Sequence, residues 1–458
     1  MKVFAIAAAV LGIAVSSAAA SPQAAKPLIV RGGLGHLVMP GDRAMLGYSV
    51  YSGSNAVRGT LYVRNNRQKI YTRIALTRSN TFRVRVPNRL IRGKRLFYYA
   101  AFTDPRSGKS LRLPASGTGT TWILNKPAVV KLGTHRFGET KAPEAVVARA
   151  RADQVGWDIT DAFRNGPQTF QVGADGSAWL EDSINNRLLV WNPGHPDQLA
   201  RSVPVPYGAG ISDVVFGPAG SLYVTKVSGD TPARFMLDRL DATTGALIWE
   251  APVAGAYLGG PGGNTYPITG RGIPLRAGPD GTLYCLVQMG LPGTDWGWMP
   301  VATAAGKPLS PKAQLRGNRW PYQPATAGLR LVGGEVYTPH DDMAPHEVRY
   351  ALIDRRDRVV RSWRILSATE MNFRRPVPEL AGGDPVVVIG FMEDTKLEYE
   401  VLRLGPQGAV ARFSLPSAVF GDASLTDVRV GPDGKLYQLA TSPETGIAIS
   451  RYSLTAGS

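Results

Sequence analysis

A turn followed by a short strand recurs along the second part of this 458-residue chain, and no other feature restricts the fold as strongly. The clearest copies are GADGSAWL (173–180), GPAGSLYV (217–224), GPDGTLYC (278–285) and GPDGKLYQ (431–438), and more degenerate copies are LRLVGGEVYT (329–338) and PELAGGDPVVVI (378–389). In most copies an aromatic residue lies near the start of the strand, and an apolar strand precedes the turn. Six units at a spacing of roughly 40–60 residues suit the four-stranded blades of a β-propeller.

Strand boundaries can be assigned inside the second unit. Its strands are expected at 211–216, 221–226, 235–240 and 246–253, with tight turns between the first and second and between the third and fourth. The sixth unit ends after its third strand, IAISRYSL (447–454). Because an open sheet edge is a liability, we expect EAVVARA (144–150) to supply the missing strand and close the ring.

These motifs resemble six-bladed propellers of the NHL type. DSINNRLLVW (182–191) is similar to their second-to-third strand step, and DATTGALIWE (241–250) resembles one repeat of the quinoprotein type. The broader superfamily includes gluconolactonase-like hydrolases and amidating lyases. Their metal-binding motifs are not evident here, and a single quinoprotein-like copy does not support quinone binding. The resemblance therefore implies an all-β propeller fold over 144–458 and no particular activity.

Residues 26–125 form a different module. Short β-rich runs separated by turn signals, such as AMLGYSVY, GTLYVR and RLFYYAAF, predict a small antiparallel sandwich. In TFRVRV, Phe82, Val84 and Val86 should face one way, and Arg83 and Arg85 the other. The stretch from Phe82 to Pro114 resembles the later strands of immunoglobulin-like or fibronectin-III-like domains of bacterial exported proteins, which serve as spacers, adhesion modules and polymer binders.

The net charge of +17 is concentrated in this module. Residues 26–125 hold 18 Lys and Arg against two acids, Asp42 and Asp104, whereas residues 126–458 hold 33 of each sign. One interpretation is a solubilising surface; the other is adhesion to an anionic cell-surface or wall polymer, an acidic polysaccharide or an anionic membrane, since arginine matches phosphate and carboxylate geometry. Nucleic acid is physically possible but a less natural partner, because the protein is expected to be exported and no recognition motif is present. The candidate anion-binding residues are Arg64, Arg67, Arg83, Arg85, Arg92, Lys94 and Arg95.

The N-terminus predicts an exported protein. Residues 1–20 combine Lys2, an apolar core of about 13 residues and a small-residue end, which is typical of a secretory signal and too short to span a bilayer. We therefore expect an extracytoplasmic, secreted or cell-surface location. Residues 126–143 are expected to be a linker. The one cysteine, Cys285, lies in an apolar strand-like run and is expected to be an inert core residue.

Long loops of the propeller fall in one sector, between about 255 and 347, and belong to one face of the ring. They hold a candidate carbohydrate- or protein-binding group, whose aromatic members alternatively pack the loops onto the blade: Asp295, Trp296, Trp298, Trp320 and Tyr322. They also hold His340, Asp342 and His346, a candidate divalent-metal group, although their spacing matches no metal motif and a solvated loop is the alternative. Other acids of that face, Glu181 and Asp182 among them, are expected to surround its mouth or to be ordinary loop residues.

Two functions follow as hypotheses. The first is a secreted, non-enzymatic binding protein whose basic sandwich holds an anionic surface while the propeller presents a ligand or partner face. The second is an extracytoplasmic propeller enzyme, a metal-assisted hydrolase or lyase acting on a sugar or lactone. A divalent metal is expected only under the second hypothesis.

Overall fold

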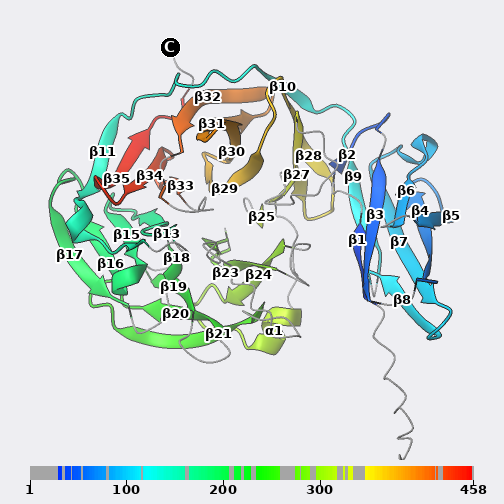
Figure 1. Cartoon of the computed structure of the whole chain (residues 1–458), viewed down its shortest axis with the longest axis horizontal. Coiled ribbons are helices and arrows are strands. Elements are labelled where there is room, and N and C mark those ends of the chain that lie inside the picture. The colour runs from blue at the N-terminus through cyan, green and yellow to red at the C-terminus, as the bar shows by residue number, and fades with distance from the viewer. Residues whose placement is uncertain are drawn as a thin grey trace, which may run out of the picture.

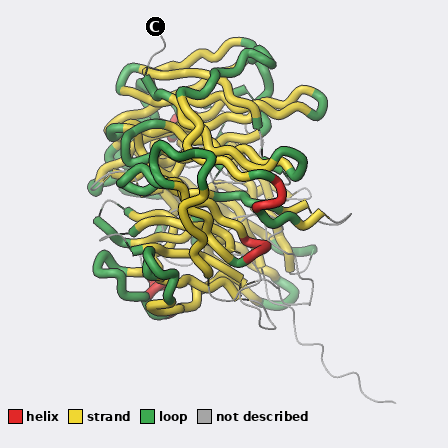
Figure 2. The backbone as a smooth tube through the Cα atoms, turned by 90° about the vertical axis from the view of Figure 1, so that its left-hand side faces the viewer, coloured by secondary structure: helices red, strands yellow, loops and turns green. Residues whose placement is uncertain are grey.

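The regular secondary structure of the described residues is almost entirely β-strand in the computed structural model. The structure describes residues 29–33, 37–42, 44–52, 55–78, 82–114, 117–159, 164–205, 211–217, 221–227, 234–257, 274–278, 280–288, 296–316, 323–324, 329–333, 346–417, 419–420 and 427–455. Within these ranges strands predominate and helix is scarce (Figure 2), with α1 (Pro311–Arg316) the one α-helix. None of the described helices is long and apolar enough to cross a membrane.

Six antiparallel sheets of the second part are arranged in a ring (Figure 1), as the blades of a propeller are. In chain order they comprise β14 (Phe170–Val172), β15 (Ala178–Asp182), β16 (Arg187–Trp191) and β17 (Leu199–Pro204); β18 (Ile211–Phe216), β19 (Leu222–Val227), β20 (Arg234–Leu240) and β21 (Leu247–Tyr257); β22 (Leu275–Ala277), β23 (Leu283–Gln288) and β24 (Trp296–Ala302); β25 (Gln323–Pro324), β26 (Leu329–Gly333), β27 (Glu347–Asp354) and β28 (Val359–Ser367); β29 (Phe373–Ala381), β30 (Asp384–Glu393), β31 (Lys396–Gly405) and β32 (Gly408–Pro416); and β33 (Val428–Val430), β34 (Leu436–Ser442) and β35 (Gly446–Tyr452). A small pair, β12 (Asp158–Ile159) and β13 (Arg164–Asn165), precedes the first sheet.

Apolar side chains from neighbouring sheets form the cores of the ring. Leu188 of the first sheet and Leu222 of the second are fully buried in one such core, and Val388 of the fifth and Leu436 of the sixth are buried in another. Successive side chains of a strand point to opposite faces of its sheet. A sheet that is covered by a neighbouring sheet on both faces therefore has apolar residues on both. The described sheets therefore stabilise one another around the circle.

The sixth sheet has a strand from far earlier in the chain. β11 (Ala145–Ala150) hydrogen-bonds antiparallel to β35, with Ala148 opposite Ile449. Ala148 is fully buried in a core that also contains Phe170 of the first sheet. The segment that we expected to close the ring thus pairs along β35 and packs against the sheet on its other side.

The basic module is one continuous sheet that folds over a single core. Its strand order is β1-β3-β6-β5-β4-β7-β9-β2, with β8 paired to β7. The strands are β1 (Ile29–Gly33), β2 (Leu37–Val38), β3 (Met45–Ser52), β4 (Arg58–Asn65), β5 (Thr72–Arg78), β6 (Phe82–Arg85), β7 (Arg95–Asp104), β8 (Lys109–Leu113) and β9 (Gly119–Ile123). Tyr48 of β3 and Phe102 of β7 are not on adjacent strands, yet their ring centroids lie 5.2 Å apart, so two layers face each other.

The alternation predicted for β6 is confirmed where side chains are described. Phe82 and Val86 are buried in the module's core and Val84 packs against it, whereas Arg85 is exposed. The buried positions of β4 and β7 follow the same rule, with Leu61 and Leu96 completely buried. The opposite face of β4 and β7 is therefore left for polar and aromatic side chains.

The two parts of the chain are docked against each other. Trp122 and Leu124 of the basic module lie in one apolar cluster with Val332, Ala351 and Ile353 of the fourth sheet of the ring. The Trp122 Nε1 donates to the backbone carbonyl of Asp357 at 3.1 Å. The basic module consequently has a defined position at the outer side of the fourth sheet (Figure 1).

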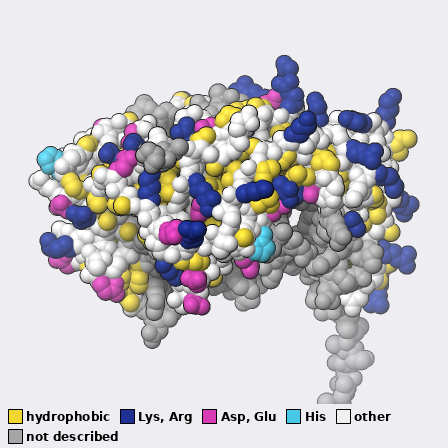
Figure 3. Space-filling view, turned by 90° about the horizontal axis from the view of Figure 1, so that it is seen from above, with side chains coloured by type: hydrophobic (Ala, Val, Ile, Leu, Met, Phe, Trp, Pro, Cys, Tyr) yellow, Lys and Arg dark blue, Asp and Glu magenta, His cyan; other side chains and the backbone are white. Residues whose placement is uncertain are grey.

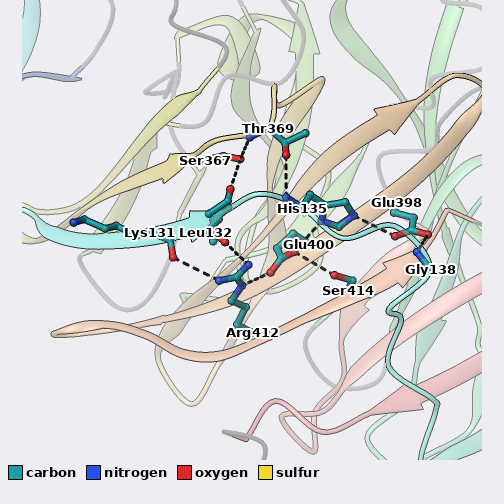
Figure 4. Close-up of polar contacts among 11 residues, drawn as sticks. Lys131, Leu132, His135, Gly138, Ser367, Thr369, Glu398, Glu400, Arg412 and Ser414 are labelled. Atoms are coloured by element: carbon teal, nitrogen blue, oxygen red, sulfur yellow. Dashed lines mark hydrogen bonds and ion pairs between the residues drawn. The ribbon is translucent and has the colours of Figure 1, made fainter.

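Residues 126–143 connect the two parts, as a linker would, but much of the segment is structured. β10 (Ala128–Gly133) adds to the fourth sheet by pairing parallel to β28. Beyond it, His135 is buried between two carboxylates of β31 (Figure 4): Nδ1 lies 3.2 Å from Glu400 Oε2, and Nε2 lies 3.1 Å from Glu398 Oε2. The imidazole also stacks on Phe391. These polar contacts attach the connecting segment 126–143 to the ring. Turn and strand propensities did not predict them.

Candidate anion-binding surface

The cations singled out from the sequence lie mostly on the surface of the basic module. Arg67, Arg85, Arg92 and Lys94 are exposed, and Arg64 is half-buried. The view from above shows Lys and Arg side chains gathered on the part of the surface at the basic-module end (Figure 3). The backbone of Arg83 lies in β6, but its side chain is outside the described residues.

Two turns bring several of these cations together. The Asn66 side-chain oxygen accepts the backbone N–H of Lys94 at 2.8 Å and that of Arg95 at 3.3 Å. This contact joins the turn between β4 and β5 to the loop before β7. Arg67, Lys69, Arg92 and Lys94 are exposed on these two segments, and the aliphatic side chain of Ile70 beside them is 82% exposed.

Neither acid of the module offsets the exposed cations. Asp42 is engaged by Arg349 of the ring, whose Nη2 donates to Asp42 Oδ1 at 3.0 Å and whose Nη1 forms a second, shorter contact. Asp104 is buried and accepts from the Arg106 backbone N–H and from the Ser107 hydroxyl at 2.9 Å. Among the described residues, no ion pair to a carboxylate is formed by Arg64, Arg67, Arg73, Arg85, Arg92, Lys94 or Arg112.

Arg95 differs from the other candidates because it pairs with the ring. Its Nη1 lies 3.1 Å from Asp357 Oδ2, in the turn between β27 and β28. Arg355 and Arg356 are exposed on the same turn. Positive charge therefore continues from the basic module onto the ring across this ion pair.

Several aromatic residues of this surface were not singled out from the sequence. Tyr62, Tyr71, Phe97 and Tyr99 lie on or beside β4, β5 and β7, and each contacts an arginine or another ring. The run RLFYYAAF contains the necessary signal, since alternate positions 95, 97 and 99 share the face opposite buried Leu96. Arg112 of β8, also missed, joins them from the neighbouring strand.

The aromatic group expected in the loops of the ring is only partly within the described residues. Trp298 is buried against Tyr284 and Leu286, so its ring packs the sheet and does not form an exposed stacking platform, which corrects that expectation for this residue. Trp296 lies in β24, but its side chain is not described. Asp295, Trp320 and Tyr322 lie outside the described residues.

The candidate metal group is likewise incomplete. His340 and Asp342 lie outside the described residues, and His346 is an exposed residue whose backbone carbonyl accepts the N–H of Ser367. Within the described part of the chain, no group of three or more metal-ligating side chains is present. The divalent-metal hypothesis therefore gains no support from these residues and stays a prediction for the rest.

Two acids expected at the mouth of the ring are buried instead. Asp182 accepts from the Gly156 backbone N–H at 2.8 Å and pairs with Arg187 at 2.7 Å. Glu181 accepts the N–H of Gln168, and burial raises the pKa of its carboxyl to about 7. These side chains hold loops and strands together and do not contribute to a solvent-exposed acidic ring. Glu393, Asp394 and Glu444 are exposed.

A buried charge cluster joins the first strands of several sheets. Arg429 of β33 contacts Asp213 of β18, donates to Glu379 of β29 at 3.0 Å, and lies 3.3 Å from the Thr169 hydroxyl. Asp213 also accepts the backbone N–H of Leu275 at 2.7 Å. One arginine here meets two carboxylates, so we assign the cluster a structural role in the ring.

Cys285 is an inert core residue, as predicted. Its side chain is completely buried in the core between the second and third sheets. Burial also raises the pKa of its thiol well above the usual value, which keeps the sulfur protonated and unreactive.

Comparison with known proteins finds likeness at the level of fold only. No protein-family model matches the chain, and no curated protein matches it in sequence. Among solved structures, a luciferin-regenerating enzyme aligns over 69% of this chain and 98% of its own, with a TM-score of 0.35 and 9% identity. An ulvan lyase of polysaccharide lyase family PL25 aligns over 80% of this chain and 91% of its own, with a TM-score of 0.30 and 8% identity.

Proposed function

We propose that this chain is an extracytoplasmic binding protein in which an immunoglobulin-like basic sandwich holds an anionic polymer or surface. In this proposal the ring is a six-bladed propeller that carries the sandwich in a defined orientation and presents a second face to a ligand or partner. The observation that carries the proposal is the unbalanced charge of the sandwich: Asp42 is engaged by the ring and Asp104 by its own loop, while Arg67, Arg85 and Arg92 are exposed.

Physical chemistry favours an anionic partner for such a surface. Exposed guanidinium groups offer paired N–H donors that match carboxylate, sulfate and phosphate oxygens. Many like charges on one module repel one another and favour counter-ions of opposite sign. The docked turn with Arg355 and Arg356 extends the cationic area, so that a polymer can contact both parts of the chain at once.

The proposal is tested by charge reversal in the full-length protein. We expect Arg92→Glu combined with Lys94→Glu to weaken retention on an anionic matrix at low ionic strength, because both side chains are exposed and their removal breaks no described side-chain contact. The matched control is Lys307→Glu combined with Lys312→Glu, two exposed lysines of the ring's third sheet and α1 region. Equal retention of both variants and the parent protein would reject the proposal.

The enzyme hypothesis is tested by a separate measurement, of bound metal. A metal-assisted hydrolase or lyase should retain a divalent ion on purification, and His340→Ala or His346→Ala should release it. A preparation without bound metal would favour the binding role.

A further inference from the structure

The outward face of the basic sandwich carries an ordered array of arginine and aromatic side chains. Leu61, Val63, Leu96 and Phe102 point to the core from β4 and β7. Alternation directs their neighbours to the other face. The array consists of the outward residues Tyr62, Arg64, Arg95, Phe97, Tyr99 and Arg112 of β4, β7 and β8, and Tyr71 lies beside them just before β5.

The first row of this array is a stack that crosses three strands. Tyr62 and Tyr99 face each other across β4 and β7, with ring centroids 4.6 Å apart and an interplanar angle of 9°. The guanidinium carbon of Arg112 lies 4.3 Å from the centroid of Tyr99. Arg112 is fixed further by hydrogen bonds to the carbonyls of Pro114 and Gly117.

The second row repeats the arrangement one step along the strands. Arg64 lies 4.9 Å from the centroid of Phe97 and 5.0 Å from that of Tyr71, and Arg95 lies 5.2 Å from Phe97. Arg64 also donates to the Gln68 carbonyl at 2.8 Å. Arginines held in this way lose less side-chain entropy on binding a ligand than free lysines would.

These contacts also indicate how a ligand is recognised. The faces of Tyr99 and Phe97 are already occupied by arginines or by another ring, whereas proteins that bind single-stranded nucleic acid offer free aromatic faces on which bases stack. Neither Arg64 nor Arg112 has a carboxylate partner among the described residues, and each Nη carries two hydrogens, of which the carbonyls of Gln68, Pro114 and Gly117 take one each; the remaining N–H groups form an edge that is left for an anion. Such edges bind oxyanions in a two-pronged manner.

The spacing of the two arginines without carboxylate partners indicates an extended ligand. Arg64 and Arg112 lie on β4 and β8, on opposite sides of β7, so two strand spacings, or about 10 Å, separate them across the sheet. The residues of β7 opposite them, Phe97 and Ala101, are four positions apart, which adds about 13 Å along the strand. A single small anion cannot reach both arginines, whereas a linear polymer can.

Resting on the anion-binding role proposed above, we infer that this face binds a linear polysaccharide bearing carboxylate or sulfate groups, with Arg64 and Arg112 as its specific contacts. Arg95 belongs to the array but pairs with Asp357, so it orients the second row and is not a free contact. The rest of the module's charge acts by long-range attraction.

The test changes the shape of the two arginine side chains and keeps their positive charge. In the full-length protein, Arg64→Lys combined with Arg112→Lys keeps the net charge but removes the planar fork and its stacking. We expect affinity for dextran sulfate and polygalacturonate to fall about tenfold, because each lysine keeps one charged donor but loses the second hydrogen bond of the guanidinium fork. The control, Arg89→Lys combined with Arg106→Lys, changes two exposed arginines outside the array and should alter affinity less than about twofold.

The other possible results test the array, the ligand class and the proposed function separately. Equal effects of the two variants, with parent binding intact, would overturn the array as the site but leave the anion-binding role standing. Tighter binding of oligo(dT), or of phosphatidylglycerol vesicles, than of either polysaccharide would overturn the inferred ligand class. A parent protein that binds none of these probes would refute the proposed function itself. Thermal unfolding of each variant shows whether lost binding reflects lost folding.

Discussion

Asp42 of the basic sandwich accepts two N–H groups from Arg349 of the ring, although the residues are 307 positions apart in sequence. Both side chains are mostly buried, with 23% and 18% of their surfaces exposed. The pair thus removes one of the sandwich's two acids from its surface and at the same time ties the sandwich to β27. The orientation of the cationic surface depends on this contact together with the apolar cluster around Trp122.

Breaking this pair should weaken the attachment of the sandwich. We expect Asp42→Asn to lower the unfolding free energy by about 1–2 kcal/mol, since the interaction is charge-assisted and partly shielded from water. A double-mutant cycle with Arg349→Gln should assign most of that loss to the pair. Asp197→Asn, whose partner Arg149 is largely exposed, should cost less than about 0.5 kcal/mol. A coupling energy near zero for Asp42 and Arg349 would contradict the structural role.

The buried histidine should determine how firmly the connecting segment is held. A neutral imidazole has one N–H donor, yet both ring nitrogens of His135 face carboxylates. His135→Phe keeps a ring against Phe391 but leaves Glu398 and Glu400 without that partner, so we expect a loss of about 3 kcal/mol. Arg136→Ala, which removes an exposed ion pair, is the control. Denaturant unfolding measures both, and faster hydrogen exchange in β10 should accompany the first. Unchanged stability of His135→Phe would exclude the anchor.

Stability should depend on pH through Glu181. The folded carboxyl has a pKa of about 7, above its ordinary value of 4.5, so the folded state binds more protons than the unfolded state between these values. The unfolding free energy must therefore fall as pH rises through this window. Glu181→Gln should remove that dependence and stabilise the protein by up to about 3 kcal/mol near pH 8, with little difference near pH 4. A difference between variant and parent that is constant across this range would contradict the assignment.

Closure of the ring by β11 can be tested with one substitution. Ala148 is completely buried between the sixth and first sheets, so Ala148→Asp introduces a buried charge without a partner and should destabilise the ring by at least about 3 kcal/mol. Arg149→Asp, one residue further and facing solvent, should have a small effect. Equal thermal midpoints for the two variants would mean that β11 does not complete a core.

Local patterns predicted much of the strand structure. In the second sheet the expected strand 211–216 corresponds to β18 (Ile211–Phe216), and the expected 246–253 overlaps β21 (Leu247–Tyr257) from its first residue, because turn residues and alternation mark these boundaries. The outward position of Arg85 followed from the same alternation, and the burial of Cys285 followed from its apolar run.

Long-range polar contacts were not predictable in this way. Nothing near His135 in the sequence indicates that it meets Glu398 and Glu400, and Asp182 looks like an ordinary loop acid until Arg187 and Gly156 fold onto it. The outward arginine and aromatic residues could have been predicted, since Arg95, Phe97 and Tyr99 occupy alternate positions of β7. Their pairing with Tyr62 and Arg112 depends on strand neighbours that a single sequence does not specify.

The salt dependence of polymer binding tests the central claim most directly. For the full-length protein and dextran sulfate, we expect the logarithm of the affinity to fall steeply and linearly with the logarithm of salt concentration up to about 0.5 M, because bound counter-ions are released and exposed charges are screened over about 10 Å at 0.1 M. Arg92→Glu combined with Lys94→Glu should make that slope shallower. An affinity that does not change with salt, or a slope identical in the parent and the charge-reversal variant, would contradict the account of the sandwich as an electrostatic binding surface.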